Sequence, residues 1–138
     1  METRWQQIYK SKIRTPEEAA AQIKDGDGIG FSLANGQPVA FSNALGKRIL
    51  AGELKDVMVF AGLGLAPTML NHPDAADKFL FDCPYLGPVE RHFSKQGLYT
   101  YTPVKLGDAD LIARRNLRPG QVMAMTVSPM DRNGFFSC

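Results

Sequence analysis

The sequence predicts an α/β protein with an open, mostly parallel sheet covered by helices. Two observations predict this fold class. Apolar runs of strand length alternate with helical patterns along the whole chain, and Gly- or Pro-containing turns separate them. The run at residues 56–60 is apolar at every position after the first, which is typical of a strand covered on both faces. Parallel strands joined through helices need right-handed crossovers, so we expect βαβ units.

The first half of the chain is expected to supply two helices and two strands. Residues 15–18 form a capping box with proline in the first turn, and the helix should run to residue 24 and stop at Gly26. A second helix is expected to begin at Pro38, because apolar residues recur after it at four-residue steps on one face. The apolar positions of that face are Phe41, Leu45 and Ile49, and the two predicted strands span residues 28–33 and 56–60.

The second half should continue the alternation after a long loop. Residues 62–73 are rich in Gly, Pro and Asn and are expected to form that loop, with a short helical turn near residues 67–70. The predicted strands that follow span residues 79–81, 98–101 and 121–127, and the predicted helices span residues 89–95 and 108–115. Turn residues then fill positions 128–134, where Asp131 suits an Asx turn and Gly134 suits a positive φ.

Composition and charge exclude several classes of protein. The chain has 138 residues, which favours one domain over residues 1–138. Its 16 Lys and Arg and 14 Asp and Glu are scattered, so nucleic acid is not an expected partner. No apolar run is long enough to span a membrane, and the start of the chain lacks a signal or transit pattern, so we expect a cytoplasmic protein. The two cysteines and two histidines lack metal-site spacing, and no metal site is expected.

Three loops at the carboxyl ends of predicted strands are the candidate ligand sites, because ligands of open α/β sheets bind there. They span residues 32–38, 62–68 and 128–134. In the first loop, backbone N–H groups near the helix start could meet a carboxylate or phosphate; the alternative is a plain connector with Asn35 and Gly36 at positive φ. In the second, Pro67 stands where a dinucleotide fingerprint needs its third glycine, so NAD is not implied. In the third, turn chemistry alone explains Ser128, and a position facing the crevice is the alternative.

Among the five glutamates, Glu90 is the one that no cap, terminus or polar loop explains. A solvated carboxylate in the first turn of a helix is the favoured interpretation, and a side chain that faces the crevice is the alternative. No serine stands in a nucleophile elbow and no histidine accompanies a cysteine, so a hydrolase triad is not supported.

The order and spacing of several short motifs resemble one known family. The motifs are Trp5, Tyr9-Lys10, residues 15–19, residues 23–27, Gly36-Gln37-Pro38, residues 43–45, the series Gly87, Arg91, Gly97 and Tyr101-Thr102-Pro103, and Ser128-Pro129-Met130-Asp131 with Gly134 and Phe136-Ser137. Together they resemble the acetyl-CoA hydrolase/transferases, a family that includes 4-hydroxybutyrate, butyryl-CoA and succinyl-CoA:acetate CoA-transferases.

The resemblance implies a CoA-transferase-like, Rossmann-like three-layer fold. It also implies an enzyme, at least dimeric, that exchanges CoA between an acyl-CoA and a short-chain carboxylic acid through a glutamyl-CoA intermediate. Coenzyme A and acyl-CoA are then substrates, and no tightly bound cofactor is implied. Acetyl-CoA hydrolysis would be a side activity. In the family the nucleophilic glutamate lies in the carboxyl-terminal half, so this chain is expected to hold no catalytic residue and to be inactive alone. Its expected partner is the carboxyl-terminal domain of the same enzyme or a second subunit.

The expected contribution of this chain is one wall of the substrate cleft. The substrate-binding candidates are Asn35, Gly36, Gln37, Arg91 and Ser128. The Arg91 guanidinium suits a substrate carboxylate or the CoA phosphates, whereas the favoured alternative is a surface ion pair with Glu90 or Asp82. Two rival functions stay open at this point: a stand-alone, non-catalytic binding module of the same fold, and a small self-sufficient transferase that uses Glu90.

Overall fold

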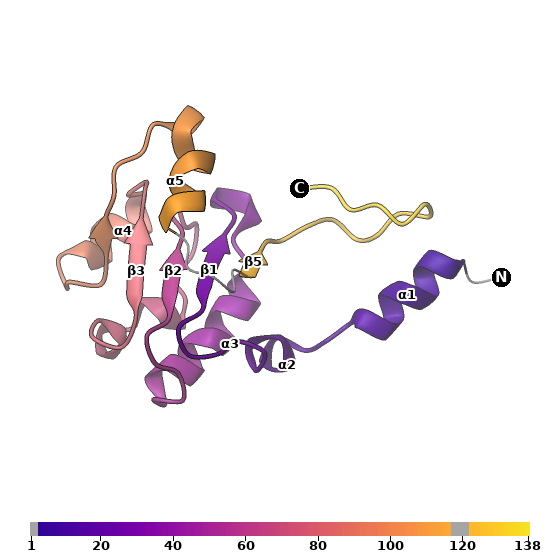
Figure 1. Ribbon diagram of the computed structural model, residues 1–138, viewed down its shortest axis with the longest axis horizontal. Coiled ribbons are helices and arrows are strands. Elements are labelled where there is room, and N and C mark those ends of the chain that lie inside the picture. The colour runs from indigo at the N-terminus through magenta and orange to yellow at the C-terminus, as the bar shows by residue number, and fades with distance from the viewer. Residues whose placement is uncertain (1–2, 117–121) are drawn as a thin grey trace.

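The computed structural model describes residues 3–116 and 122–138 and contains a five-stranded sheet in which every strand pair is parallel (Figure 1). The strand order is β4-β3-β2-β1-β5, so the chain starts near one side of the sheet, proceeds outward, and returns to pair β5 with β1. The strands are β1 (Gly28–Phe31), β2 (Met58–Phe60), β3 (Leu80–Cys83), β4 (Thr100–Tyr101) and β5 (Val122–Ala124). The predicted α/β class with a parallel sheet is confirmed.

The helices follow the predicted alternation, with one addition at the amino terminus. The α-helices are α1 (Arg4–Lys12), α2 (Pro16–Ala20), α3 (Val39–Leu50), α4 (Pro88–Ser94) and α5 (Ala109–Asn116). Single 3-10 turns are η1 (Ala34–Gly36), η2 (Met69–Asn71), η3 (Pro73–Ala75) and η4 (Leu106–Asp108). None of the helices in the described part of the chain is long and apolar enough to cross a bilayer.

Several element ends differ from the prediction because tertiary contacts end the elements early. Helix α2 stops at Ala20, where the Arg48 guanidinium of α3 donates to the carbonyl oxygens of Ala20 and Ile23. Strand β2 begins two residues late because Asp56 has a φ of +55°. Strand β5 ends at Ala124; its predicted first residue, Gln121, lies outside the described residues.

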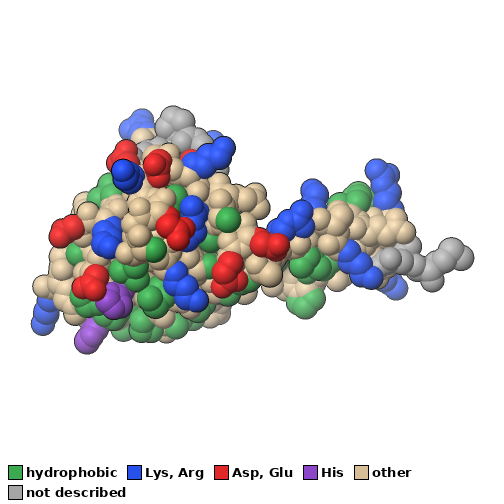
Figure 2. Space-filling view, turned by 90° about the horizontal axis from the view of Figure 1, so that it is seen from below, with side chains coloured by type: hydrophobic (Ala, Val, Ile, Leu, Met, Phe, Trp, Pro, Cys, Tyr) green, Lys and Arg blue, Asp and Glu red, His purple; other side chains and the backbone are tan. Residues whose placement is uncertain are grey.

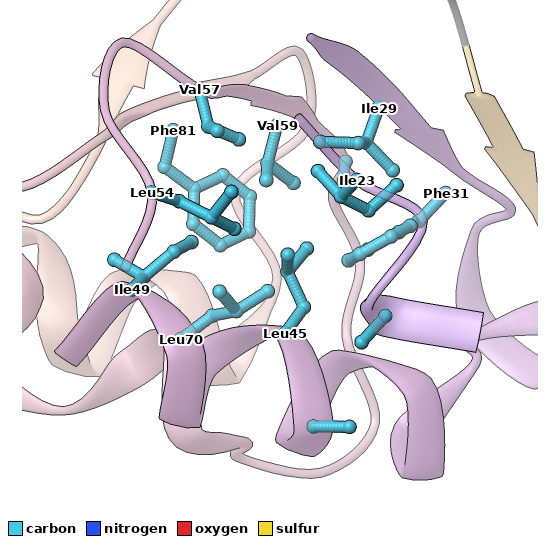
Figure 3. Close-up of a cluster of buried hydrophobic side chains, with 13 residues drawn as sticks. Ile23, Ile29, Phe31, Leu45, Ile49, Leu54, Val57, Val59, Leu70 and Phe81 are labelled. Carbon is cyan, nitrogen blue, oxygen red and sulfur yellow. The ribbon is translucent and has the colours of Figure 1, made fainter. Parts of the chain in front are cut away.

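The hydrophobic core lies between the sheet and α3. Ile29 of β1 and Val59 of β2 point from the sheet toward Leu45 and Ile49 of α3, and all four side chains are fully buried (Figure 3). Leu70 of η2 closes the same cluster. The helical face predicted from four-residue spacing is therefore the face that packs on the sheet, and the core fixes where the strand ends lie.

Helix α1 and the last residues form a separate structural feature. Helix α1 was not predicted from the sequence; it begins with a capping box formed by Thr3 and Gln6. Tyr9 packs on Phe136 with ring centroids 5.7 Å apart, and a Cβ added at Gly134 would lie 2.8 Å from Trp5 Cγ. We call residues 3–14 and 127–138 the terminal arm. Figure 1 shows that this arm projects away from the sheet.

The turn in the terminal arm has the predicted chemistry. The Asp131 carboxylate accepts hydrogen bonds from the backbone N–H groups of Asn133 and Phe135, and Gly134 has a φ of +91°. The predicted Asx turn and the predicted positive φ are both confirmed.

Candidate functional site

The carboxyl ends of β1, β2 and β3 meet at one edge of the sheet, and the segments that follow them surround a small cavity. Its empty volume is about 360 Å³ including the open mouth, and the centre of a water molecule can occupy about 20 Å³ of it. That is room for about one water. Its polar lining consists of Ser32, Gln37, Ser42, Thr68, Asn71 and Glu90. The cavity is too small to hold an acyl-CoA by itself. Residues of two of the three candidate loops, 32–38 and 62–68, form part of its wall.

Glu90 forms one side of this cavity and holds two loops. Its side chain is only 3% exposed. Oε1 accepts a hydrogen bond from Gly64 N at 2.7 Å, and Oε2 accepts one from Gly87 N at 2.8 Å. The favoured interpretation of Glu90 as a solvated carboxylate is therefore wrong. The segment after β2 folds over the start of α4 and removes the first-turn carboxylate from water.

Both glycines that contact Glu90 leave little space for a side chain. A Cβ added at Gly64 would lie 3.0 Å from Glu90 Oε1, and a Cβ added at Gly87 would lie 2.8 Å from Oε2. The sequence shows these glycines, but it does not show which side chain approaches them. Sequence reasoning missed this contact because residues 64 and 90 are far apart along the chain.

Gln37 holds the same loop from the other side. Its Oε1 accepts hydrogen bonds from Leu65 N at 2.9 Å and Ala66 N at 3.2 Å, while its Nε2 donates to Ala66 O at 2.9 Å. Glu90 and Gln37 together thus bind three consecutive backbone N–H groups. We call residues 62–66 the clamped loop. The structure gives Gln37 a positioning role, and its role in binding substrate stays a prediction.

Asn35 and Gly36 lie in η1, beside the clamped loop. The residue with positive φ is Ala34, at +48°, and not Asn35 or Gly36 as the connector interpretation expected. Gly36 is required for a different reason, since an added Cβ would lie 2.3 Å from Ser32 Oγ. Ala34 N also donates to Leu63 O at 3.2 Å, so η1 and the clamped loop form one unit.

Arg91 lies exposed in α4, and its Nε donates to the carbonyl oxygen of Leu86 at 3.0 Å. The favoured alternative, an ion pair with Glu90 or Asp82, is wrong. Among the described residues no ion pair joins them, because both carboxylates are buried beneath the surface on which Arg91 lies. The guanidinium therefore remains accessible to an anion.

Ser128 lies in the terminal arm rather than with the other candidates. Its Oγ accepts a hydrogen bond from Ser137 N at 3.0 Å and donates to Pro129 O at 3.1 Å. Before the arm begins, Thr126 is held beside η1, since its N and Oγ1 donate to the carbonyl oxygens of Gly36 and Gln37, each at 2.9 Å. The structure thus brings Asn35, Gly36 and Gln37 together and leaves Ser128 in the arm.

Sequence reasoning also missed a group of buried and partly buried polar side chains in and near the cavity wall. Asn71 Nδ2 donates to Tyr99 Oη, and the Asn71 Oδ1 accepts from Thr68 N at 2.7 Å. Burial raises the pKa of the Tyr99 hydroxyl, and the nearby Glu90 carboxylate raises it further. Asp82 is 4% exposed, and its Oδ1 has no hydrogen-bond partner. Within residues 3–116 and 122–138, no three His, Cys, Asp or Glu side chains are grouped so as to hold a metal ion.

The two cysteines are expected to differ sharply in reactivity. Burial raises the pKa of the Cys83 thiol to about 12, and the charges of Glu90 and Asp82 add to this, so Cys83 should stay protonated at pH 8. Cys138 is exposed. We expect a thiol reagent at pH 8 to titrate one thiol in the native chain and two in guanidinium chloride. Two fast thiols in the native state would contradict the burial of Cys83.

Comparison with known proteins shows the family of this chain. The chain matches the model of the acetyl-CoA hydrolase/transferase N-terminal domain over residues 1–138. It is 30% identical to butyryl-CoA:acetate CoA-transferase of Anaerostipes caccae over 130 residues, which is 94% of this chain and 29% of that protein. It is 29% identical to succinyl-CoA:cyclohexane-1-carboxylate CoA transferase of Geobacter metallireducens over 134 residues, or 97% of this chain and 30% of that protein.

A solved structure shares the fold. RipA from Yersinia pestis superposes with a TM-score of 0.81 at 24% identity, over 97% of this chain and 33% of that one. The chain spans about 30% of the length of the two curated CoA-transferases named above.

The parallel sheet, with loops gathered around a small cavity at its carboxyl edge, defines an α/β domain. More specifically, this chain belongs to the acetyl-CoA hydrolase/transferase family, and it is the amino-terminal domain of that family.

Proposed function

We propose that this domain is the amino-terminal part of an acyl-CoA:carboxylate CoA-transferase. The observation that carries the proposal is the family match over residues 1–138, together with relatives that are named CoA-transferases and are about three times as long. The enzyme exchanges CoA between an acyl-CoA and a short-chain carboxylic acid. A second, carboxyl-terminal domain supplies the nucleophile, and a tightly bound cofactor is not required.

The proposed reaction is a covalent relay through a glutamate of that second domain. The carboxylate attacks the acyl-CoA carbonyl carbon, the C–S bond breaks, and CoA thiolate departs. The product on the enzyme is an acyl-glutamyl anhydride. The thiolate then attacks the glutamyl carbonyl and displaces the first carboxylic acid as its carboxylate. The resulting glutamyl-CoA thioester reacts with the acceptor acid by the same steps in reverse. Water in place of the acceptor acid gives hydrolysis as a side activity.

This chain would contribute a rigid wall opposite that glutamate. Glu90 and Gln37 fix the clamped loop without side-chain motion, which is the preorganisation that a water-excluding cleft requires. The candidates for direct substrate contact are Asn35, Gly36 and Arg91, and Ser128 would reach the cleft only where the terminal arm borders it. Cytoplasmic location and dimeric assembly stay predictions from the sequence.

Arg91 gives a direct test of substrate contact. In the complete enzyme, Arg91→Ala should raise the KM for an acyl-CoA or acid substrate roughly 10-fold with little change in kcat, because the exposed guanidinium would contribute binding in both ground and transition states. Lys95→Ala, an exposed cation at the end of the same helix, is the matched control and should leave KM unchanged. If Arg91→Ala and Lys95→Ala have the same KM, Arg91 does not contact the substrate.

The proposed function is tested by CoA exchange between acetyl-CoA and butyrate. The complete polypeptide that contains this domain should catalyse the exchange, and the 138-residue chain alone should not. Intact-mass spectrometry of the isolated chain with acetyl-CoA should show no CoA adduct. An adduct that Glu90→Gln abolishes would instead assign the nucleophile to this chain. Tight CoA binding by the isolated chain, with no exchange by any longer polypeptide, would favour the non-catalytic binding module.

A further inference from the structure

The terminal arm lacks the burial that a stable structure needs. Helix α1 has nine residues, and none of them is buried. Isolated helices shorter than about 12 residues are marginal in water. Contacts between α1 and residues 127–138 include Trp5 against Gly134 and Tyr9 against Phe136. These contacts leave most of both segments in solvent, so the arm needs a covering surface.

The exposed side of the arm is apolar and positively charged. Phe135 is 70% exposed and Trp5 is 50% exposed. Ile13, Tyr9 and Phe136 are exposed as well. Exposed aromatic side chains of this size, close together, mark an interaction site on a soluble domain. The arm contains five basic residues, Arg4, Lys10, Lys12, Arg14 and Arg132, and one acidic residue, Asp131. Figure 2 shows hydrophobic side chains between Lys and Arg side chains on the projecting part of the molecule.

We propose that the terminal arm is the docking surface for the carboxyl-terminal domain of the same enzyme, which meets it with an apolar patch rimmed by acidic side chains. This inference rests on the proposed function, because the second domain is the one that function requires. The relatives contain about 70% of their length beyond the matched region, which is ample polypeptide to cover the arm. The arm also continues directly from β5 through Thr126. The backbone N and the Oγ1 of Thr126 donate hydrogen bonds to the carbonyl oxygens of Gly36 and Gln37.

Hydrogen–deuterium exchange of the complete enzyme and of the 138-residue chain tests this proposal. In the complete enzyme, amides of α1 and of residues 128–137 should exchange roughly 100-fold more slowly than in the chain alone. Amides of β2 and α3 lie in the core and should be protected in both. The chain alone is measured at two concentrations tenfold apart. Protection of the arm that rises with concentration would assign the surface to a second copy and overturn the proposal, as would equal protection of the arm in both proteins.

Two variants of the complete enzyme locate the contact. Phe135→Asp should reduce the protection of α1 at least 10-fold, because it places a charge in an apolar interface. Leu106→Asp changes an equally exposed side chain, 72% against 70%, outside the arm and should leave that protection unchanged. An equal effect of both variants, or of neither, would overturn the docking site. Arm protection without any CoA exchange would contradict the proposed function and leave the docking site standing. A gene that stops at Cys138 and has no second subunit would contradict both.

Discussion

Replacing Glu90 by alanine should destabilise the domain by about 3 kcal/mol, because two backbone N–H groups lose their acceptor in a site that water does not freely reach. The melting temperature should fall by roughly 10 °C for a domain of this size. Glu90→Gln should have a smaller effect, since the amide oxygen keeps one acceptor while its NH2 group faces the other N–H. The measurement is thermal and urea unfolding followed by circular dichroism.

Glu18 provides the matched control for Glu90. It occupies the same position of a helix, third after the cap, and its Oε2 accepts a hydrogen bond from Thr15 N at 2.8 Å, but it is exposed. Glu18→Ala should therefore cost about 0.5–1 kcal/mol, because water replaces the lost acceptor. If both variants cost the same, Glu90 does not hold the clamped loop.

Gly46→Ala should destabilise the domain by about 1–3 kcal/mol, although alanine is the better helix former. An added Cβ would lie 2.7 Å from the carbonyl carbon of Met69 and 2.8 Å from Leu70 N, and backbone atoms cannot move aside as a flexible side chain can. Helix α3 and η2 would have to separate, which opens the core around Leu70. The measurement is the free energy of unfolding in urea.

Gly107→Ala is the control for this substitution. A Cβ added at Gly107 meets no atom within 4 Å, so the change in the free energy of unfolding should stay within about 0.5 kcal/mol. Stabilisation by Gly46→Ala, as expected for a glycine in an exposed helix, would show that α3 and η2 do not pack as closely as the structure indicates.

Most of the helices and strands could be predicted from local sequence patterns. The capping box at Thr15 and Glu18 predicted the start of α2, and four-residue spacing predicted that Leu45 and Ile49 of α3 face the core. Element ends were predicted less well because distant residues set them. The Arg48 guanidinium at the end of α2 is one example, since a residue 28 positions away supplies the donor.

The candidate site was predicted in part. The features that were not predicted depend, like the element ends, on contacts between residues distant in the sequence. Loop composition predicted connecting segments after β1 and β2, and the structure confirms them; their role in binding substrate stays a prediction. It did not predict that Glu90 is buried, because a glutamate in a first helical turn is normally solvated and only the fold of the clamped loop removes it from water. It also did not separate Ser128 from the other candidates, because the hydrogen bond that holds Ser128 Oγ in the terminal arm comes from Ser137, which local composition does not reveal.

The sequence by itself determined the family, the parallel α/β class and the helical face that packs on the sheet, since each follows from local patterns or from their order along the chain. Only the tertiary structure decided that Glu90 and Gln37 bind three consecutive amides and that the terminal arm projects with its aromatic side chains exposed. The physical reason is that burial and long-range hydrogen bonds depend on tertiary contacts between segments that are distant in the sequence. Local periodicity does not specify those contacts.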